Sequence, residues 1–238
     1  MGLISVVLEE QKNVLAGAET TVVSGLAFAP NGRGASALPA DWECLPQFDR
    51  YLLMMPADSV DVRSELLKRF YDFIAPEFER LADRSRNLEN ISYLLAELEI
   101  RCGPLSGLPI LDLGSGTGLS LDLARALGID VVGVEISAGM AQIASSRGMP
   151  VLTPGNLGAL PEAAGAIASY VLHFGIPPET LRAVLTRLAP SGLLLGNVHH
   201  GTNLDKLTRA TATAGGQIVT WTPKAPLSRH GLYVAIGR

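Results

Sequence analysis

The stretch that decides the fold is ILDLGSGTG, residues 110–118. Its apolar start, Pro109–Leu113, is typical of a buried strand, and a helical segment follows the last glycine. Three of the five residues 114–118 are glycine, which tolerates positive φ and lets backbone approach a ligand closely. A glycine-rich turn between a strand and a helix is typical of nucleotide-binding α/β domains. This stretch therefore predicts a nucleotide-containing ligand at the end of a first strand.

The spacing of these glycines differs from the dinucleotide fingerprint G-x-G-x-x-G. The third glycine comes one residue early, and Leu119 stands where that fingerprint has glycine. Asp112 lies two residues before the first glycine. A carboxylate there would repel a pyrophosphate but suits a ligand that carries an ammonium and a sulfonium, such as S-adenosylmethionine. A dinucleotide-dependent dehydrogenase stays the alternative enzyme.

Two motifs in register resemble the class I S-adenosylmethionine-dependent methyltransferases, in particular their small-molecule branch. The first is residues 110–118, and the second is VVGVEISAGM at residues 131–140. The resemblance covers residues 108–238, and FYDFIAP at residues 70–76 resembles the lead helix of many small-molecule members. It implies an α/β fold: a Rossmann-like seven-stranded class I methyltransferase sheet with an N-terminal, mostly helical cap.

The pattern after residue 108 supports this fold, because short apolar strands alternate with helices, as in parallel sheets covered on both faces. The expected strands are 109–113, 131–134, 150–153, 166–172, 193–198, 217–221 and 232–236. The expected helices are 120–127, one capped by Ser137 and ending at Gly148, 178–188 and 204–214. No helix separates the last two strands, so that pair should be antiparallel.

A connector rich in glycine and proline, Cys102–Pro109, divides the chain. We expect residues 1–107 to form a cap that covers the substrate and residues 108–238 to form the cofactor-binding domain. Within the cap, residues 61–74 and a helix capped by Asn87 carry apolar stripes of helical period. Residues 1–60 show no clear pattern.

The resemblance implies which residues serve the cofactor. Glu135, 23 residues after Asp112, would accept hydrogen bonds from the ribose hydroxyls. Asn156 stands where the family usually has an acid, and Met140 could pack on the adenine or belong to the helix core. The expected cofactor-binding residues are Asp112, Gly114, Ser115, Gly116, Glu135, Ile136, Met140, Asn156, Leu157 and Tyr170.

Catalytic candidates follow the fourth and fifth strands, since ligands of open α/β sheets bind outside the carboxyl ends of the strands. We expect His173 and His199 there, because imidazole titrates near neutrality and can accept a proton. Tyr71, Phe174 and His200 are the expected substrate contacts. Methyl transfer by alignment alone, without a base, stays open. No histidine pair has the spacing of a zinc site, so we expect no metal.

The connection after the fifth strand, residues 199–203, is too short for a lid, so the pocket's aromatic roof should come from residues 1–100. An aromatic-lined pocket favours a small organic acceptor, whether held in one chain or at the seam of a homodimer. We therefore expect S-adenosylmethionine-dependent methyl transfer to an O or N atom of a small organic molecule, in specialised metabolism. The alternative is a cofactor-binding, methyltransferase-like protein without methyl transfer, acting as a partner subunit or a non-methylating catalyst.

Composition excludes several other classes. The 238 residues carry a net charge of −4 without a basic stretch, so we expect no nucleic-acid partner. Glycine, proline and polar residues break the longest uncharged stretches, so we expect no membrane span. The two cysteines, Cys44 and Cys102, form no metal motif and indicate a reducing, cytoplasmic location, although one disulfide stays open.

Overall fold

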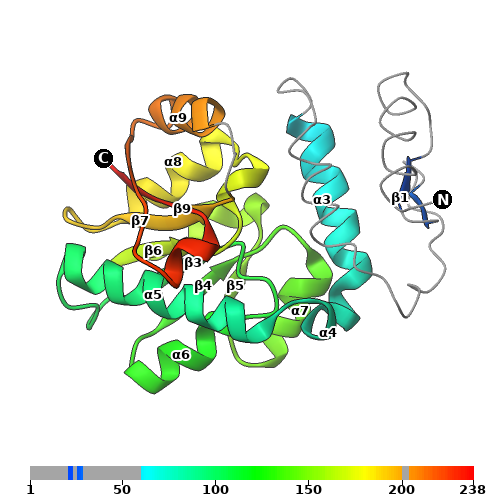
Figure 1. Ribbon diagram of the computed structural model, residues 1–238, viewed down its shortest axis with the longest axis horizontal. Helices are drawn as coiled ribbons and strands as arrows, with labels where there is room; N and C mark the ends of the chain where they lie inside the picture. The colour runs from blue at the N-terminus through cyan, green and yellow to red at the C-terminus, as the bar shows by residue number, and fades with distance from the viewer. Residues whose placement is uncertain (1–20, 24–25, 29–59, 200–203) are drawn as a thin grey trace. The chain divides into compact units, whose positions relative to one another are not determined.

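The structure, a computed structural model, describes residues 21–23, 26–28, 60–199 and 204–238 (Figure 1). The chain divides into two compact units, Met1–Arg69 and Phe70–Arg238. In the first unit, β1 (Thr21–Val23) and β2 (Leu26–Phe28) form an antiparallel hairpin. The boundary lies within the helix α3 (Val60–Ile74), and all the residues discussed below belong to the second unit. The division at 107/108 stays a prediction about domains.

The second unit contains a seven-stranded sheet of order β5-β4-β3-β6-β7-β9-β8. Its strands are β3 (Ile110–Leu113), β4 (Val131–Val134), β5 (Val151–Leu152), β6 (Gly165–Ala168), β7 (Leu194–Val198), β8 (Gln217–Trp221) and β9 (Leu232–Gly237). Strand β9 pairs antiparallel with both β7 and β8, and the other pairs are parallel. The predicted fold is confirmed. The strand order reverses between β3 and β6, where ligands of such sheets bind.

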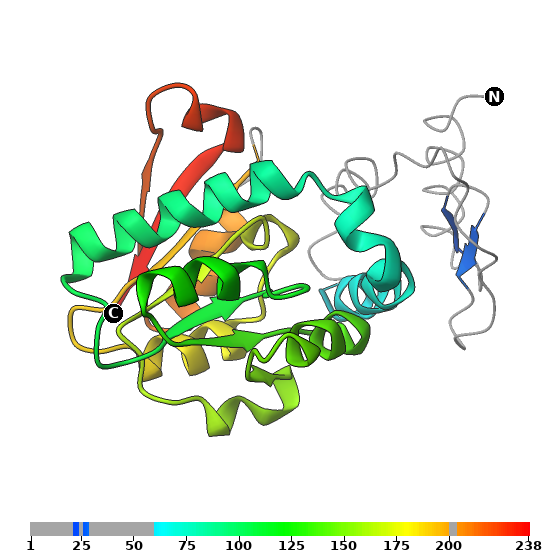
Figure 2. The ribbon, with the colours of Figure 1, turned by 90° about the horizontal axis from the view of Figure 1, so that it is seen from below.

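Helices cover both faces of the sheet, as Figure 1 shows. One face is covered by α5 (Arg84–Cys102), α6 (Leu119–Leu127) and α7 (Ala138–Ser146), whose apolar side chains share a core with β3 and β9. The other face is covered by α8 (Pro178–Arg187) and α9 (Leu204–Thr213). Figure 2 shows α5 along its whole length across the sheet. In the described parts of the chain, no helix is both long and apolar enough to cross a membrane.

Helix α5 begins one turn earlier than the sequence predicts. The Asp83 carboxylate accepts a hydrogen bond from the Arg86 N–H at 2.9 Å and caps the helix, so the expected cap, Asn87, lies inside it. The predicted apolar stripe is confirmed, since Ile91, Leu95 and Leu98 are buried against the sheet. The added turn carries Arg86 to the edge of the sheet where the site lies.

Strand β6 ends earlier than predicted, at Ala168 rather than at residue 172. Tyr170 has φ 57°, a left-handed conformation that is uncommon for a residue other than glycine. Its N–H donates to Asn197 Oδ1 at 2.8 Å, which holds the turn. The next residues form the short helix η4 (Leu172–Phe174), so His173 lies on that helix and not on a strand.

Candidate active site

The glycine-rich turn after β3 leaves space above its middle. Gly114, Gly116 and Gly118 have φ of 74°, 54° and 83°. A Cβ on Gly114 would lie 2.3 Å from Cγ2 of Val171, whereas a Cβ on Gly116 would meet no atom within 4 Å. The turn therefore packs tightly against the chain that follows β6 and is open at Gly116, where a ligand can approach the backbone.

Ser115 supports this turn from the side of the sheet. Its side chain is buried, and a Cβ on Gly133 of β4 would lie 2.5 Å from its Oγ. Its N–H donates to the carbonyl of Val134 at 3.3 Å. The serine thus packs against β4, and the expected contact of Ser115 with the cofactor stays a prediction.

Glu135, directly after β4, is buried and connects two backbone segments. Its Oε2 accepts from the Gly116 N–H and its Oε1 from the Ser137 N–H, both at 2.8 Å. Burial raises the pKa of this carboxyl, and these hydrogen bonds oppose the shift. Each carboxylate oxygen can accept a further hydrogen bond, so the group fits the ribose hydroxyls.

Asp112, on β3, is buried beside Glu135. The Ser120 hydroxyl donates to Oδ2 of Asp112. Burial raises the pKa of Asp112 to about 7, the Ser120 hydrogen bond opposes this, and the negative charge of Glu135 adds to it. Burial disfavours the ionised form of both carboxyls, and a nearby positive charge would favour it, so the pair fits a positively charged ligand. The chemistry of the site therefore fits S-adenosylmethionine, which carries an ammonium and a sulfonium.

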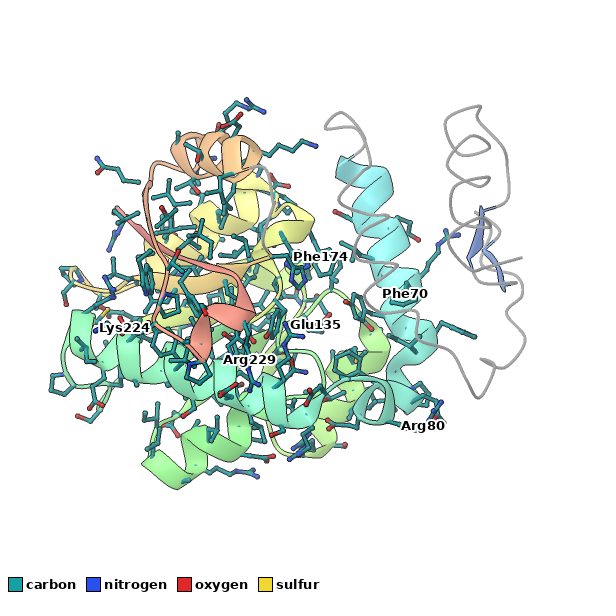
Figure 3. All side chains as sticks on the ribbon, in the orientation of Figure 1. Phe70, Arg80, Glu135, Phe174, Lys224 and Arg229 are labelled. Carbon is teal, nitrogen blue, oxygen red and sulfur yellow. The ribbon has the colours of Figure 1, made fainter. Side chains whose placement is uncertain are left out.

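A row of aromatic and imidazole rings follows the carboxyl ends of β6 and β7. Between ring centroids, Tyr170 lies 5.7 Å from His199, His199 lies 4.2 Å from His173, and His173 lies 4.1 Å from Phe174. Tyr71 then lies 6.2 Å from Phe174. The structure thus brings together five predicted site residues, and Figure 3 shows the side chains of this region, with Glu135 and Phe174 labelled.

The two histidines of this row differ in burial. His173 is buried, and burial, with the nearby His199, holds its pKa well below the usual value. His199 is half-buried and lies between His173 and Tyr170. His200 lies outside the described residues. His199 is therefore the better placed of the two predicted catalytic residues to meet a ligand.

Four residues that the sequence did not single out form a network with the Tyr170 hydroxyl, two of them in direct contact with it. That hydroxyl forms a hydrogen bond with Nδ1 of His230 and accepts from Nε of Arg86 at 3.2 Å. Nε2 of His230 lies 2.8 Å from Glu89 Oε2, and Nε of Arg229 donates to that same oxygen at 3.0 Å. His230 lies two residues before the start of β9. Because β9 is antiparallel, its beginning lies at the edge where the parallel strands end, and this was the available signal.

Residues 62–217 match a family of methyltransferase domains. The chain belongs to the class I S-adenosylmethionine-dependent methyltransferase family. It is 25% identical over 147 residues to a demethylmenaquinone methyltransferase of Renibacterium salmoninarum, a region that is 59% of this chain and 62% of that relative. The match therefore spans less than two thirds of the relative's length.

Two solved structures resemble this methyltransferase in fold. One is a putative methyltransferase of Haloferax volcanii in complex with a methyltransferase activator, with TM-score 0.54, 18% identity, and coverage of 70% of this chain and 96% of that chain. The other is magnesium protoporphyrin IX methyltransferase of Synechocystis with bound S-adenosylmethionine, with TM-score 0.52 and 20% identity. That match covers 74% of this chain and 97% of the other.

The start of α7 in this methyltransferase is fixed by Asp72, which the sequence had not assigned a role. Ser137 Oγ accepts from the Met140 N–H at 3.1 Å and donates to Asp72 Oδ1 at 2.7 Å. The Gly139 N–H also donates to Asp72 Oδ1, at 2.9 Å. Asp72 thus joins the end of α3 to the segment that contains Glu135.

The other predicted cofactor residues lie around this segment. Met140 is fully buried in the first turn of α7, and Ile136 is half-buried. Asn156 is exposed on η3 (Pro154–Ala159), whereas Leu157 packs partly on the core. Their contacts with a cofactor stay predictions. Among the described residues of the methyltransferase, no three His, Cys, Asp or Glu residues gather as a metal site would require.

Proposed function

We propose that the protein transfers the methyl group of S-adenosylmethionine to an O or N atom of a small organic molecule, in specialised metabolism. The row of rings from Tyr170 to Tyr71, next to the glycine-rich turn, carries this proposal. Pockets for small organic ligands are lined mainly by apolar and aromatic side chains with a few polar groups. A flat small-molecule acceptor fits such a row of rings better than the surface of a protein acceptor would.

On this proposal, the cofactor occupies the open space at Gly116, next to the buried carboxylates. Glu135 holds the ribose hydroxyls, and Asp112 balances the positive charge. When bound, S-adenosylmethionine supplies an electrophilic methyl group on its sulfonium sulfur. Exclusion of water by the surrounding rings keeps that methyl group for the acceptor.

On this proposal, the acceptor lies against His199, Phe174 and Tyr71. His199, half-buried and between two rings, is placed to accept a proton from the acceptor. His173 is buried, and its low pKa keeps it uncharged at neutral pH, so it can support His199 without repelling a cationic cofactor.

Two measurements test the proposal. Calorimetric titration compares S-adenosylhomocysteine with NAD, and we expect binding of the first alone. Transfer of a labelled methyl group is then measured with small aromatic acceptors that bear hydroxyl, amino or thiol groups. Asp112→Ala should lose cofactor binding, whereas Glu162→Ala, at an exposed carboxylate before β6, should keep it. Tight binding of NAD without S-adenosylhomocysteine, or cofactor binding without transfer to any acceptor, contradicts the proposal.

A further inference from the structure

Tyr170, His230 and Glu89 form a chain of hydrogen bonds at the edge of the ring row. The carboxylate of Glu89 can only accept, so the 2.8 Å contact places a proton on Nε2 of His230. Nδ1 of a neutral His230 is then an acceptor, and the Tyr170 hydroxyl donates to it. The chain therefore has one direction: from the tyrosine oxygen through the imidazole to the carboxylate.

A single buried side chain fixes both ends of the first link. Asn197 Oδ1 accepts from the Tyr170 N–H, and Asn197 Nδ2 donates to the His230 carbonyl, both at 2.8 Å. Gly231 has φ 106°, and a Cβ there would lie 2.0 Å from the Val198 carbonyl oxygen. Glycine therefore lets His230 come close to the end of β7. The hydrogen bond from the Tyr170 N–H to Asn197 also holds Tyr170 in its left-handed conformation. Backbone strain that the surrounding structure maintains in this way is common at functional sites.

Burial and two neighbouring guanidinium groups keep His230 neutral near pH 7. Burial lowers the pKa of His230, and the Glu89 carboxylate opposes the shift. The guanidinium groups of Arg86 and Arg229 disfavour a further positive charge. Both arginines also contact the chain itself, Arg86 at the Tyr170 hydroxyl and Arg229 at Glu89. The imidazole can therefore accept a proton, and Glu89 stabilises it once it has.

We infer that Tyr170, and not His199, is the catalytic residue that takes the proton from a hydroxyl-bearing acceptor, with His230 and Glu89 as positioning residues that receive the tyrosine's own proton. The inference rests on the proposed function. As the acceptor oxygen bonds to the methyl carbon, the carbon–sulfur bond breaks and its electron pair goes to sulfur. The acceptor's proton passes to Tyr170 Oη, and the Tyr170 proton passes to Nδ1 of His230. The products are the methyl ether, S-adenosylhomocysteine with an uncharged sulfur, and an imidazolium paired with Glu89.

This relay indicates the substrate class. An aromatic hydroxyl holds its proton at neutral pH and needs an acceptor for it, whereas an arenethiol is already largely ionised at pH 8. The ring of Tyr170 stacks with that of His199, so the relay oxygen belongs to the row of rings against which a flat acceptor lies. The expected acceptor is therefore a phenol, with an un-ionised hydroxyl group on an aromatic ring.

Phenol and thiophenol are matched probes of this inference. Tyr170→Phe and His230→Gln should lower kcat for phenol by about 100-fold or more, because general base catalysis contributes about 10²–10⁴-fold. The loss of kcat for thiophenol in the same variants should be at least about 30-fold smaller than the loss for phenol, because thiophenol needs no proton acceptor. The rate with phenol should be flat from pH 7 to 9 in the wild type, and should rise with pH in His230→Gln. Glu89→Gln keeps an acceptor for Nε2–H and should cause a smaller loss.

Ring ¹⁵N spectra of the histidines give a readout without any ligand. At pH 7.5, His230 should be neutral with its proton on Nε2, and Tyr170→Phe should shift the Nδ1 resonance. A proton on Nδ1 overturns the relay, and so does an equal loss of both methylations, which indicates a structural role. Wild-type methylation of amines without phenol overturns the relay but leaves the proposed function standing, whereas methylation of thiophenol alone overturns both. Transfer to no probe overturns both.

Discussion

Glu135 Oε2 accepts a hydrogen bond at 2.8 Å from the backbone N–H of Gly116, which precedes it by 19 residues. The other oxygen of the same carboxylate accepts from the Ser137 N–H at the start of α7. This carboxylate therefore adds a side-chain link between the two sequence motifs of the cofactor site, whose strands β3 and β4 are already paired. Glu135 has a structural role in addition to the ribose contact that the sequence predicts.

Glu135→Ala should lower both cofactor affinity and stability. The sequence alone predicts a loss of about ten- to a hundred-fold in affinity with the fold intact. The structure adds a loss of stability, because the buried Ser137 N–H loses its partner, at about 1–3 kcal/mol, and the half-buried Gly116 N–H loses one too. Urea denaturation measures the stability and calorimetry the affinity. Glu135→Gln, which keeps one acceptor oxygen, should recover part of the stability, and an unchanged urea midpoint in Glu135→Ala would contradict the assignment.

The fold could be predicted because its signals are local. Glycines at 114, 116 and 118, short apolar strands and capping residues each act within a few positions, and together they indicate one topology. The errors arose where distant residues decide. Asp83 and Asn87 are both good caps by residue type, and β6 ends where it does because Tyr170 bonds Asn197, 27 residues away.

The site could be predicted only in part for the same reason. The two sequence motifs indicated Asp112 and Glu135, and the predicted carboxyl ends of the strands indicated His173 and His199. His230 contacts residues 60 and 141 positions away, and no short pattern marks it. Such contacts follow from how β9 enters the sheet and from the extra turn of α5, which only the folded chain brings together.

Gly114→Ala should destabilise the protein more than Gly116→Ala. Both glycines have positive φ, so a side chain strains the backbone at either position, but only at Gly114 would a Cβ lie 2.3 Å from Val171. Overpacking costs about 1–3 kcal/mol in addition. Thermal unfolding of both variants compares the effects. Adding Val171→Ala should restore stability to the Gly114→Ala variant but not to the Gly116→Ala variant. Equal effects of the two glycine variants would contradict the tight packing of the turn. Gly116→Ala should instead mainly weaken cofactor binding, because its Cβ enters the open space.

Asn197→Ala should destabilise the protein strongly. It leaves the Tyr170 N–H and the His230 carbonyl without this partner, and it removes an acceptor of Asn90 Nδ2, which lies 3.0 Å from Asn197 Oδ1. Each buried group left unsatisfied costs about 1–3 kcal/mol. Asn156→Ala, at an exposed asparagine, is the matched control and should stay within about 0.5 kcal/mol of the wild type. Chemical denaturation of both variants tests this, and similar midpoints would show that the Asn197 network contributes little.

The ionisation of Asp112 should make both the stability of the protein and its affinity for the cofactor depend on pH, with opposite signs. Burial raises its pKa in the folded protein to about 7, well above the ordinary value of 3.8. Between these values the folded chain holds a proton that the unfolded chain has released, so stability should fall as pH rises from about 4 to about 7 and level off above. Each pH unit in that window is worth at most about 1.4 kcal/mol. Asp112→Asn, whose amide oxygen still accepts from Ser120, should remove this dependence of stability on pH. The variant should gain stability over the wild type, and the gain should be larger at pH 8 than at pH 5.

Binding of the cationic cofactor should show the reverse sign, because a positive charge near Asp112 favours its ionised form. The affinity for S-adenosylmethionine should therefore fall as pH drops below about 7, by up to about tenfold per unit, and binding near pH 6 should release a proton. Calorimetry in two buffers of different ionisation enthalpy measures that proton. Asp112→Asn should bind more weakly at pH 8 and show neither the pH dependence nor the proton release. A wild-type affinity that is constant from pH 5.5 to 8, or proton release that persists in Asp112→Asn, would place the linked proton on another group and separate Asp112 from the charge of the cofactor.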